Sequence, residues 1–105
     1  MKKRIVWLDR DTFPKRLKIN RPDFDHSWKN YSSTDEGSII NRIKDANVII
    51  VNKVDLKNKY LSKANKLELI ALSATGTNIV DLKYCKKHNI KVCNLRNYAS
   101  HAVAE

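Results

Sequence analysis

The sequence LIALSATGTNIVDL, residues 69–82, decides how the chain is expected to fold. Its apolar start, Leu69–Leu72, predicts a buried strand, and the small polar residues around Gly76 predict a tight loop. The apolar pattern that resumes behind Asn78 predicts the beginning of a helix. A strand, a loop and a helix in this order are typical of a parallel α/β sheet.

The loop within this stretch has two interpretations. Gly76 is one of only two glycines in the chain, and a glycine at a strand end permits a positive φ or the close approach of a ligand. The N–H groups of Thr75, Gly76 and Thr77 would lie near a helix N-terminus, where small anions such as carboxylates are held. The same residues could equally form an ordinary turn, and the sequence leaves both interpretations open.

Length and composition predict one globular domain. The chain has 105 residues, of which 42% are hydrophobic, and this is enough for one core. The longest apolar run, Val48–Val51, is far too short to span a bilayer. The basic opening MKKR precedes only a few apolar residues before Asp9, which is not the pattern of a signal peptide. We therefore expect a cytoplasmic protein.

The formal net charge of +10 raises the question of a nucleic-acid partner. The lysines are scattered along the chain, and no dense basic tract interleaves with aromatic residues. The sequence therefore argues against nucleic-acid binding. Cys85 and Cys93 fit neither a C-x-x-C pair nor a zinc-ligand spacing, so we expect them to be small core residues without a disulfide.

The rest of the chain continues the alternation of strands and helices. Strands are expected at residues 4–8, 28–31, 47–52, 67–71 and 90–94. A helix capped by Ser33 or Thr34 should bury Ile39, Ile40 and Ile43. A helix at residues 57–64 should bury Tyr60 and Leu61. A helix at residues 80–88 should bury Val80, Cys85 and one of Leu82 and Tyr84, and a last helix should begin at residue 100. The pattern predicts an α/β fold, a flavodoxin-like parallel sheet with helices on both faces.

In such folds ligands bind beyond the carboxyl ends of the strands. That rule gathers several polar segments on one edge of the sheet: Asp9, Asn52, Lys53, Thr75 with Gly76, and residues 94–98. Asp9 could line a ligand crevice there, cap the next segment or pair with Arg10. We favour a structural role for it.

Several stretches together resemble one known family. They are WLDRDTFP, VNKV, LIALSATGTNIVDL, IKVCN and RNYASHAVAE. In this order they look like the N-terminal part of the D-isomer-specific 2-hydroxyacid dehydrogenases, in the glycerate dehydrogenase (hydroxypyruvate reductase) branch. The resemblance runs from near Arg4 to Glu105.

The resemblance implies a protein with two lobes that have different roles. Residues 1–97 would be the flavodoxin-like substrate, or catalytic, domain, and residues 98–105 would begin the hinge helix toward an absent Rossmann domain that binds NAD or NADP. The backbone N–H groups of Thr75 and Gly76 would hold the substrate carboxylate. Lys53 and Val54 would line the same pocket, and Tyr98 in the hinge would complete it.

The chain departs from the family in what it lacks. Its only glycines are Gly37 and Gly76, so no G-x-G-x-x-G is available to cradle a pyrophosphate. The family's catalytic Arg, Glu and His belong to the part that follows, and His101 does not match that motif. We therefore expect no catalytic or metal-binding residues, no cofactor bound by this chain alone, and no dehydrogenase activity without a second lobe.

Other functions remain open at this point. The chain could be a non-catalytic module that binds small anions or associates with itself, or a basic nucleic-acid-binding domain. The expected partners are a weakly bound 2-hydroxy or 2-oxo acid, a companion nucleotide-binding chain or a second copy, and no membrane. A response-regulator receiver is disfavoured because Asn52 and Lys53 occupy the phosphoacceptor region. The sequence specifies neither which 2-hydroxy acid is preferred nor NAD over NADP.

Overall fold

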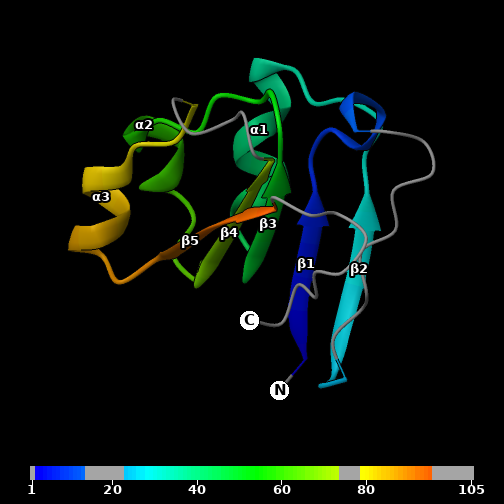
Figure 1. Ribbon diagram of the computed structural model, residues 1–105, viewed down its shortest axis with the longest axis horizontal. Coiled ribbons are helices and arrows are strands. Elements are labelled where there is room, and N and C mark those ends of the chain that lie inside the picture. The colour runs from blue at the N-terminus through cyan, green and yellow to red at the C-terminus, as the bar shows by residue number, and fades with distance from the viewer. Residues whose placement is uncertain (1, 14–22, 74–78, 96–105) are drawn as a thin grey trace.

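The computed structural model describes residues 2–13, 23–73 and 79–95. In this part of the chain five strands form one parallel sheet in the order β2-β1-β3-β4-β5 (Figure 1). The strands are β1 (Lys3–Trp7), β2 (His26–Asn30), β3 (Val48–Val51), β4 (Leu69–Ser73) and β5 (Lys91–Leu95). This is the flavodoxin-like order, so the predicted fold class is confirmed.

The sequence of each strand fits its place in the sheet. All four residues of β3 are buried, as expected for a central strand that is covered on both faces. Strand β2 lies at an edge and is largely exposed and polar. The predicted strands at 4–8 and 28–31 are present, and β2 begins two residues earlier than expected, at His26.

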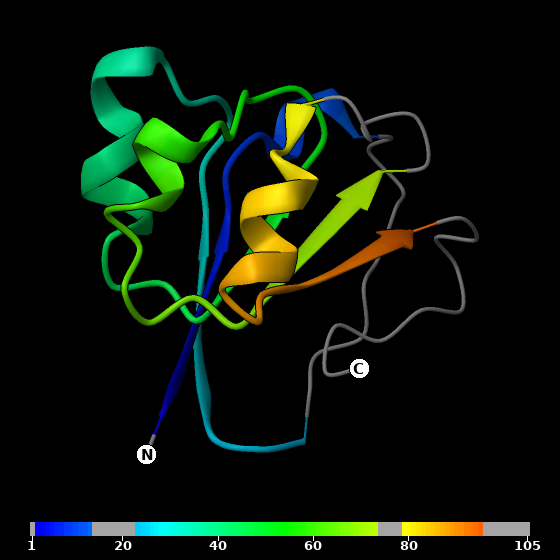
Figure 2. The ribbon, with the colours of Figure 1, turned by 90° about the vertical axis from the view of Figure 1, so that its left-hand side faces the viewer.

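The described α-helices all cover one face of the sheet, so within the described residues the predicted helices on both faces are found on one face only. They are α1 (Glu36–Ile43), α2 (Asn58–Leu61) and α3 (Leu82–Lys87), and Figure 2 shows them gathered on the same side of the strands. Their buried residues join one strand face in a single core: Val6, Ile39, Ile43, Ile49, Val51, Tyr60, Leu61, Ile70, Leu72 and Cys85. None of the described helices is long and apolar enough to span a membrane.

The alternate strand residues form a second core on the opposite face. It contains Ile5, Trp7, Val48, Ile50, Leu69 and Ala71, together with Phe13 from the end of the 3-10 helix η1 (Arg10–Thr12). The rings of Trp7 and Phe13 meet edge to face, with centroids 4.9 Å apart, a favourable aromatic geometry. The sheet is therefore apolar on both faces.

The start of α1 differs from the prediction. Its N-cap is Asp35, without a side-chain cap hydrogen bond, and the hydroxyl of Thr34 donates instead to the carbonyl of Leu8 at 2.7 Å. Thr34 thus ties the segment before α1 to the end of β1. Ile40 was expected in the core but is 39% exposed, because it lies about 100° around the helix from Ile39.

The start of α3 also differs. Asp81 caps this helix by accepting a hydrogen bond from the Tyr84 N–H at 3.0 Å, so the helix begins at Leu82 and not at Val80. Val80 instead forms a parallel bridge with Leu56 and is buried. Leu82 is 50% exposed, so of the two alternatives it is not the core contact, whereas Tyr84 packs against the core.

Both cysteines are free, as expected. Cys85 is buried and Cys93 is half-buried. Burial raises the pKa of the Cys85 thiol to about 11, so this side chain stays protonated at neutral pH and is a poor nucleophile. The packing role predicted for the cysteines agrees with these positions.

Candidate functional site

The carboxyl ends of the parallel strands bring together the polar residues that the sequence placed on one edge. Asp9 follows β1 by two positions, and Asn52, Lys53 and Val54 follow β3 directly. Strands β1 and β3 are neighbours, with Trp7 opposite Ile50. The loop after β1 therefore meets the loop after β3.

Asp9 is the centre of this meeting point. Its carboxylate is 1% exposed and accepts hydrogen bonds from three successive backbone N–H groups. The donors are Asn52, at 3.0 and 3.1 Å to the two oxygens, Lys53 at 2.5 Å and Val54 at 3.1 Å. We call these three donors the N–H nest, since successive backbone N–H groups in a turn form an anion-binding concavity. The favoured structural role of Asp9 agrees with this geometry.

A second set of hydrogen bonds fixes the same two loops. The Asn52 side-chain amide donates to the carbonyl of Thr12 at 3.1 Å and to its hydroxyl at 3.0 Å. The hydroxyl and N–H of Thr12 donate in turn to the Asp9 carbonyl, at 2.8 and 3.0 Å. This bridge was not predicted from the sequence, although polar residues directly behind two apolar strands were its signal. The two loops form one cross-linked unit.

Two of the predicted substrate-binding residues lie in this unit. The backbone N–H groups of Lys53 and Val54 already donate to Asp9, so only their side chains remain for a ligand. The Lys53 side chain is exposed, whereas Val54 is half-buried and packs against the helix-side core. Lys53 is therefore the residue of this pair that presents charge at the edge.

The other predicted substrate-binding residues, Thr75, Gly76 and Tyr98, lie outside the described residues. Strand β4, which leads to the glycine loop, is described to its end at Ser73. It pairs with β3 as far as Val51 opposite Leu72. The chain therefore leaves the sheet toward Thr75 from the strand adjacent to the one that leads to Lys53.

Asn94 adds an unused polar atom at this edge. It lies in β5 opposite Leu72, near the carboxyl end of the strand. Its side-chain oxygen Oδ1 is buried, and no described residue donates to it. Buried acceptors normally have a partner, so this atom is available to a donor. Asn94 belongs to the edge segment 94–98 that the sequence predicted.

The described residues offer neither a metal centre nor a nucleotide cradle. No group of three His, Cys, Asp or Glu side chains among them could hold a metal ion. Gly37 lies in α1, and a Cβ added there would meet only an Asp35 oxygen at 3.9 Å. That contact is an ordinary one, so no neighbour approaches Gly37 closely enough to require a glycine there. Gly37, the glycine within the described residues, therefore gives no sign of a site built for the close approach of a pyrophosphate.

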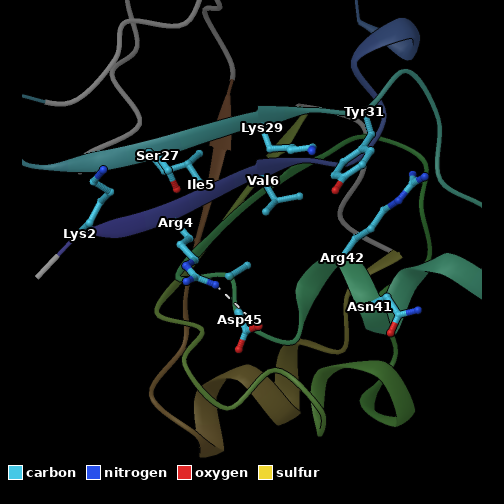
Figure 3. Close-up of a pocket in the computed structure, with 11 residues that line it drawn as sticks. Lys2, Arg4, Ile5, Val6, Ser27, Lys29, Tyr31, Asn41, Arg42 and Asp45 are labelled. Atoms are coloured by element: carbon cyan, nitrogen blue, oxygen red, sulfur yellow. Dashed lines mark ion pairs between the residues drawn. The ribbon is translucent and has the colours of Figure 1, made fainter.

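A second candidate surface lies away from this edge, between α1 and strands β1 and β2 (Figure 3). It is an open cavity of about 440 Å³ bordered by four cationic residues: Lys2, Arg4, Lys29 and Arg42. The sequence reasoning missed this grouping because the residues are far apart in the chain. The parallel register of β1 and β2, which sets Arg4 opposite Ser27 and Val6 opposite Lys29, brings them together.

Three of the four cations of this groove have partners within the protein. Arg42 stacks on the Tyr31 ring at 3.9 Å and donates to the Ser33 carbonyl at 2.7 Å. Lys29 also lies over the Tyr31 ring, at 5.6 Å, and Arg4 pairs with Asp45 at 3.7 Å. Two cations already use the Tyr31 ring, whereas single-stranded nucleic acids stack bases on free rings. The Tyr31 ring is therefore not a free stacking platform for nucleic-acid bases.

Comparison with known proteins identifies the family to which the chain belongs. Residues 11–105 match the family described as D-isomer specific 2-hydroxyacid dehydrogenase, catalytic domain. A Haemophilus influenzae protein provisionally assigned as a 2-hydroxyacid dehydrogenase is 42% identical over 102 residues, which are 97% of this chain and 32% of that protein. Glycerate dehydrogenase of Methylorubrum extorquens is 37% identical over 106 residues, which span 100% of this chain and 33% of the enzyme.

A solved structure shows the same fold. The NAD+-bound 3-phosphoglycerate dehydrogenase of Entamoeba histolytica superposes with a TM-score of 0.68 at 18% identity, over 90% of this chain and 33% of that one. The 105 residues thus span about one third of the length of the curated relatives they match. The chain belongs to the D-isomer-specific 2-hydroxyacid dehydrogenase family, and its residues match the catalytic domain of that family.

Proposed function

We propose that this chain is the substrate-binding lobe of an NAD(P)-dependent D-2-hydroxyacid dehydrogenase of the glycerate or hydroxypyruvate type. The observation that carries the proposal is the carboxyl edge of the sheet. There the Asp9-bound loop with Lys53 lies beside β4, whose continuation is the glycine loop. The similarity to glycerate dehydrogenase over the whole chain supports the substrate type.

The role of these residues in the proposed enzyme is to bind and orient the substrate. The backbone N–H groups of Thr75 and Gly76 hold the carboxylate of a 2-hydroxy or 2-oxo acid. The exposed ammonium of Lys53 adds positive charge beside it, and Tyr98 closes the pocket from the hinge. Fixing the carboxylate places carbon 2 for reaction, and such positioning lowers the barrier without taking part in bond making.

Hydride transfer itself requires groups that these residues do not supply. The reaction needs a nicotinamide and a general acid or base next to carbon 2. The nucleotide-binding lobe, on the same polypeptide or on a companion chain, is the partner that the proposal requires. We expect the 105 residues alone to give no oxidation of NADH with hydroxypyruvate or glyoxylate above a buffer blank.

Substrate binding can be measured without the second lobe. We expect hydroxypyruvate to cause saturable chemical-shift changes in the ¹⁵N–¹H spectrum of the chain at Lys53, Val54, Thr75, Gly76 and Tyr98. D-glycerate and glyoxylate should act at the same residues. Dihydroxyacetone, which lacks the carboxylate, should not. Absence of saturable shifts at millimolar hydroxypyruvate would reject the proposal.

A pair of variants tests the role of Lys53. Lys53→Met removes the charge at the edge, and Lys63→Met removes the same charge from an exposed position just beyond α2. An exposed charge pair contributes little, so we expect Lys53→Met to weaken hydroxypyruvate binding about 2- to 5-fold. Lys63→Met should leave it unchanged. Equal effects of the two substitutions would show only a general charge effect.

A further inference from the structure

The open groove between α1 and strands β1 and β2 combines a concave surface with an excess of positive charge. We propose that it binds an acidic segment of another polypeptide, which lies extended along the two strands. We call this surface the basic groove, and its four cations surround a buried apolar floor: Lys2, Arg4, Lys29 and Arg42 around Val6 and Ala46. The basic groove lies away from the carboxyl edge, so its role is independent of the proposed function.

The strand register gives the basic groove its length. Lys2, Arg4 and Val6 alternate along β1 and the residue before it, and Lys29 of β2 lies opposite Val6. Positions four residues apart along a strand are separated by about 13 Å. Figure 3 accordingly shows Lys2 toward one end of the groove and Arg42 toward the other. An extended peptide has the same repeat as the strands, so its alternate side chains match the alternate cations.

Arg42 is already oriented at its end of the basic groove. Its guanidinium stacks on the Tyr31 ring at 3.9 Å, and its Nη1 donates at 2.7 Å both to the Ser33 carbonyl and to the Thr34 hydroxyl. No described residue accepts a hydrogen bond from its Nε or Nη2. These remaining donors can bind one carboxylate through two parallel hydrogen bonds. Because the side chain is held in place beforehand, less conformational entropy is lost on binding.

The other three cations can also accept a new carboxylate. Arg4 and Asp45 are 3.7 Å apart, and their side chains are 60% and 49% exposed, so this ion pair contributes little and can be rearranged. Lys2 and Lys29 are exposed, and no described carboxylate lies within ion-pair distance of either ammonium. Four cations thus share the groove with the single carboxylate of Asp45.

The mixed chemistry of the basic groove favours a polypeptide over a nucleic acid. A peptide brings side-chain carboxylates for the cations and backbone N–H groups that can donate to Asp45. A phosphate backbone brings negative charge and no donor, so Asp45 would repel it. The Tyr31 ring is already used by Lys29 and Arg42 and is not open to stacked bases.

Exposure and net charge argue against two other occupants. Small-molecule sites bury most of their ligand, whereas Lys2, Arg4 and Lys29 are exposed side chains around an open groove. A second copy of the chain would bring 21 Lys and Arg residues against 11 Asp and Glu residues, and like charges of this excess repel each other. The acidic segment therefore belongs to a different polypeptide.

A model peptide tests the basic groove directly. The probe is a capped peptide of about seven residues in which glutamate alternates with threonine, long enough to span the groove. We expect saturable ¹⁵N–¹H shifts at Arg4, Lys29, Tyr31 and Arg42, with a Kd of about 0.1–1 mM at low salt. Binding should weaken as the salt concentration rises from about 0.01 M to about 0.15 M, because the screening length falls from about 30 Å to about 8 Å. The same peptide with glutamine in place of glutamate should cause no saturable shifts.

Two charge-reversal variants separate the groove from the charge of the whole chain. Lys29→Glu reverses a charge within the groove, and Lys63→Glu reverses the same charge at an exposed position just beyond α2. We expect Lys29→Glu to weaken peptide binding about 5- to 10-fold and Lys63→Glu to weaken it less than about 2-fold. Both side chains are exposed, so both variants should keep the wild-type circular dichroism spectrum.

Three results would overturn the proposal. The first is the absence of saturable shifts with the glutamate peptide at low salt. The second is an equal loss of peptide binding in the two variants, which would show general charge attraction and no groove. The third is tighter binding of a single-stranded oligothymidylate, or an equal response to inorganic phosphate, at the same groove residues, since either would assign the surface to phosphate groups.

Discussion

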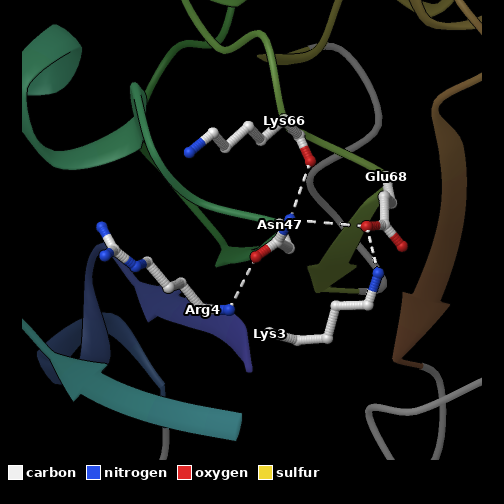
Figure 4. Close-up of polar contacts among 5 residues, drawn as sticks. All are labelled: Lys3, Arg4, Asn47, Lys66 and Glu68. Carbon is white, nitrogen blue, oxygen red and sulfur yellow. Dashed lines mark hydrogen bonds and ion pairs between the residues drawn. The ribbon is translucent and has the colours of Figure 1, made fainter. Parts of the chain in front are cut away.

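Two polar clusters join the same neighbouring strands at opposite ends of the sheet, and their chemistry differs. At the carboxyl end, the buried Asp9 carboxylate binds backbone N–H groups. At the amino end, the Asn47 amide accepts from the Arg4 N–H at 2.8 Å and donates to the Lys66 carbonyl at 3.1 Å and to Glu68 at 3.4 Å (Figure 4). Lys3 completes this amino-end cluster through an ion pair with Glu68.

The two clusters differ in how deeply their polar groups are buried. The amino-end cluster is exposed to water, and the ion-paired side chains of Lys3 and Glu68 remain 41% and 51% exposed. Water can replace most of its hydrogen bonds. The carboxyl-end cluster, formed by Asp9, Thr12 and residues 52–54, has a carboxylate that water hardly reaches. We therefore expect substitutions at the carboxyl end to cost more free energy of unfolding.

The largest effect is expected at Asp9. Asp9→Ala leaves three N–H groups without their acceptor in a turn that is partly buried, so the free energy of unfolding should fall by about 3–5 kcal/mol. Urea denaturation followed by circular dichroism measures this change, with Asp11→Ala as the exposed control. If Asp9→Ala lowered the free energy of unfolding by less than about 1 kcal/mol, the carboxyl-end cluster would not contribute more to stability than the amino-end cluster.

A smaller effect is expected at Asn47. Asn47→Ala removes hydrogen bonds to Arg4, Lys66 and Glu68 at a half-buried position, so we expect a loss of about 1–2 kcal/mol by the same urea assay. The N–H resonances of Lys53 and Val54 should keep their positions, because this variant leaves the carboxyl end intact. If Asn47→Ala lowered the free energy of unfolding as much as Asp9→Ala does, the two clusters would contribute equally to stability.

The smallest effect is expected for the exposed ion pair. Lys3→Met breaks the contact with Glu68, and surface pairs of this kind contribute about 0–1 kcal/mol. Any loss should shrink further at about 1 M salt, where the screening length is only about 3 Å. Lys2→Met, which removes the same charge one residue away, is the reference. A salt-independent loss would mean that Lys3 acts through packing and not through charge.

The sequence predicted the sheet well because its signals were local. The unbroken apolar run Val48–Val51 could only be a doubly covered strand, and the alternation of apolar strands with helical patterns implied parallel order. The helix starts were less predictable. Ser33, Thr34 and Asp35 all stand before α1, and Thr34 donates to the Leu8 carbonyl while Asp35 takes the N-cap position.

The sequence predicted which residues lie at the site only where those residues directly follow a strand. The rule for parallel sheets placed Asp9, Asn52 and Lys53 on one edge, and the structure brings them together. The rule does not tell which polar group binds which. The pairing of a carboxylate with three N–H groups, and the grouping of Arg4, Lys29 and Arg42 around a groove, depend on strand register, which no local pattern encodes.

A single ¹⁵N–¹H titration with hydroxypyruvate examines both ends of the sheet at once. We predict saturable shifts at Lys53, Gly76 and Tyr98, and unchanged positions for the N–H resonances of Arg4 and Asn47 at the amino end. Such a result would identify the carboxyl edge as the substrate site. Shifts that are absent, or that appear equally at the two ends, would contradict the central claim that this lobe binds substrate at its carboxyl edge.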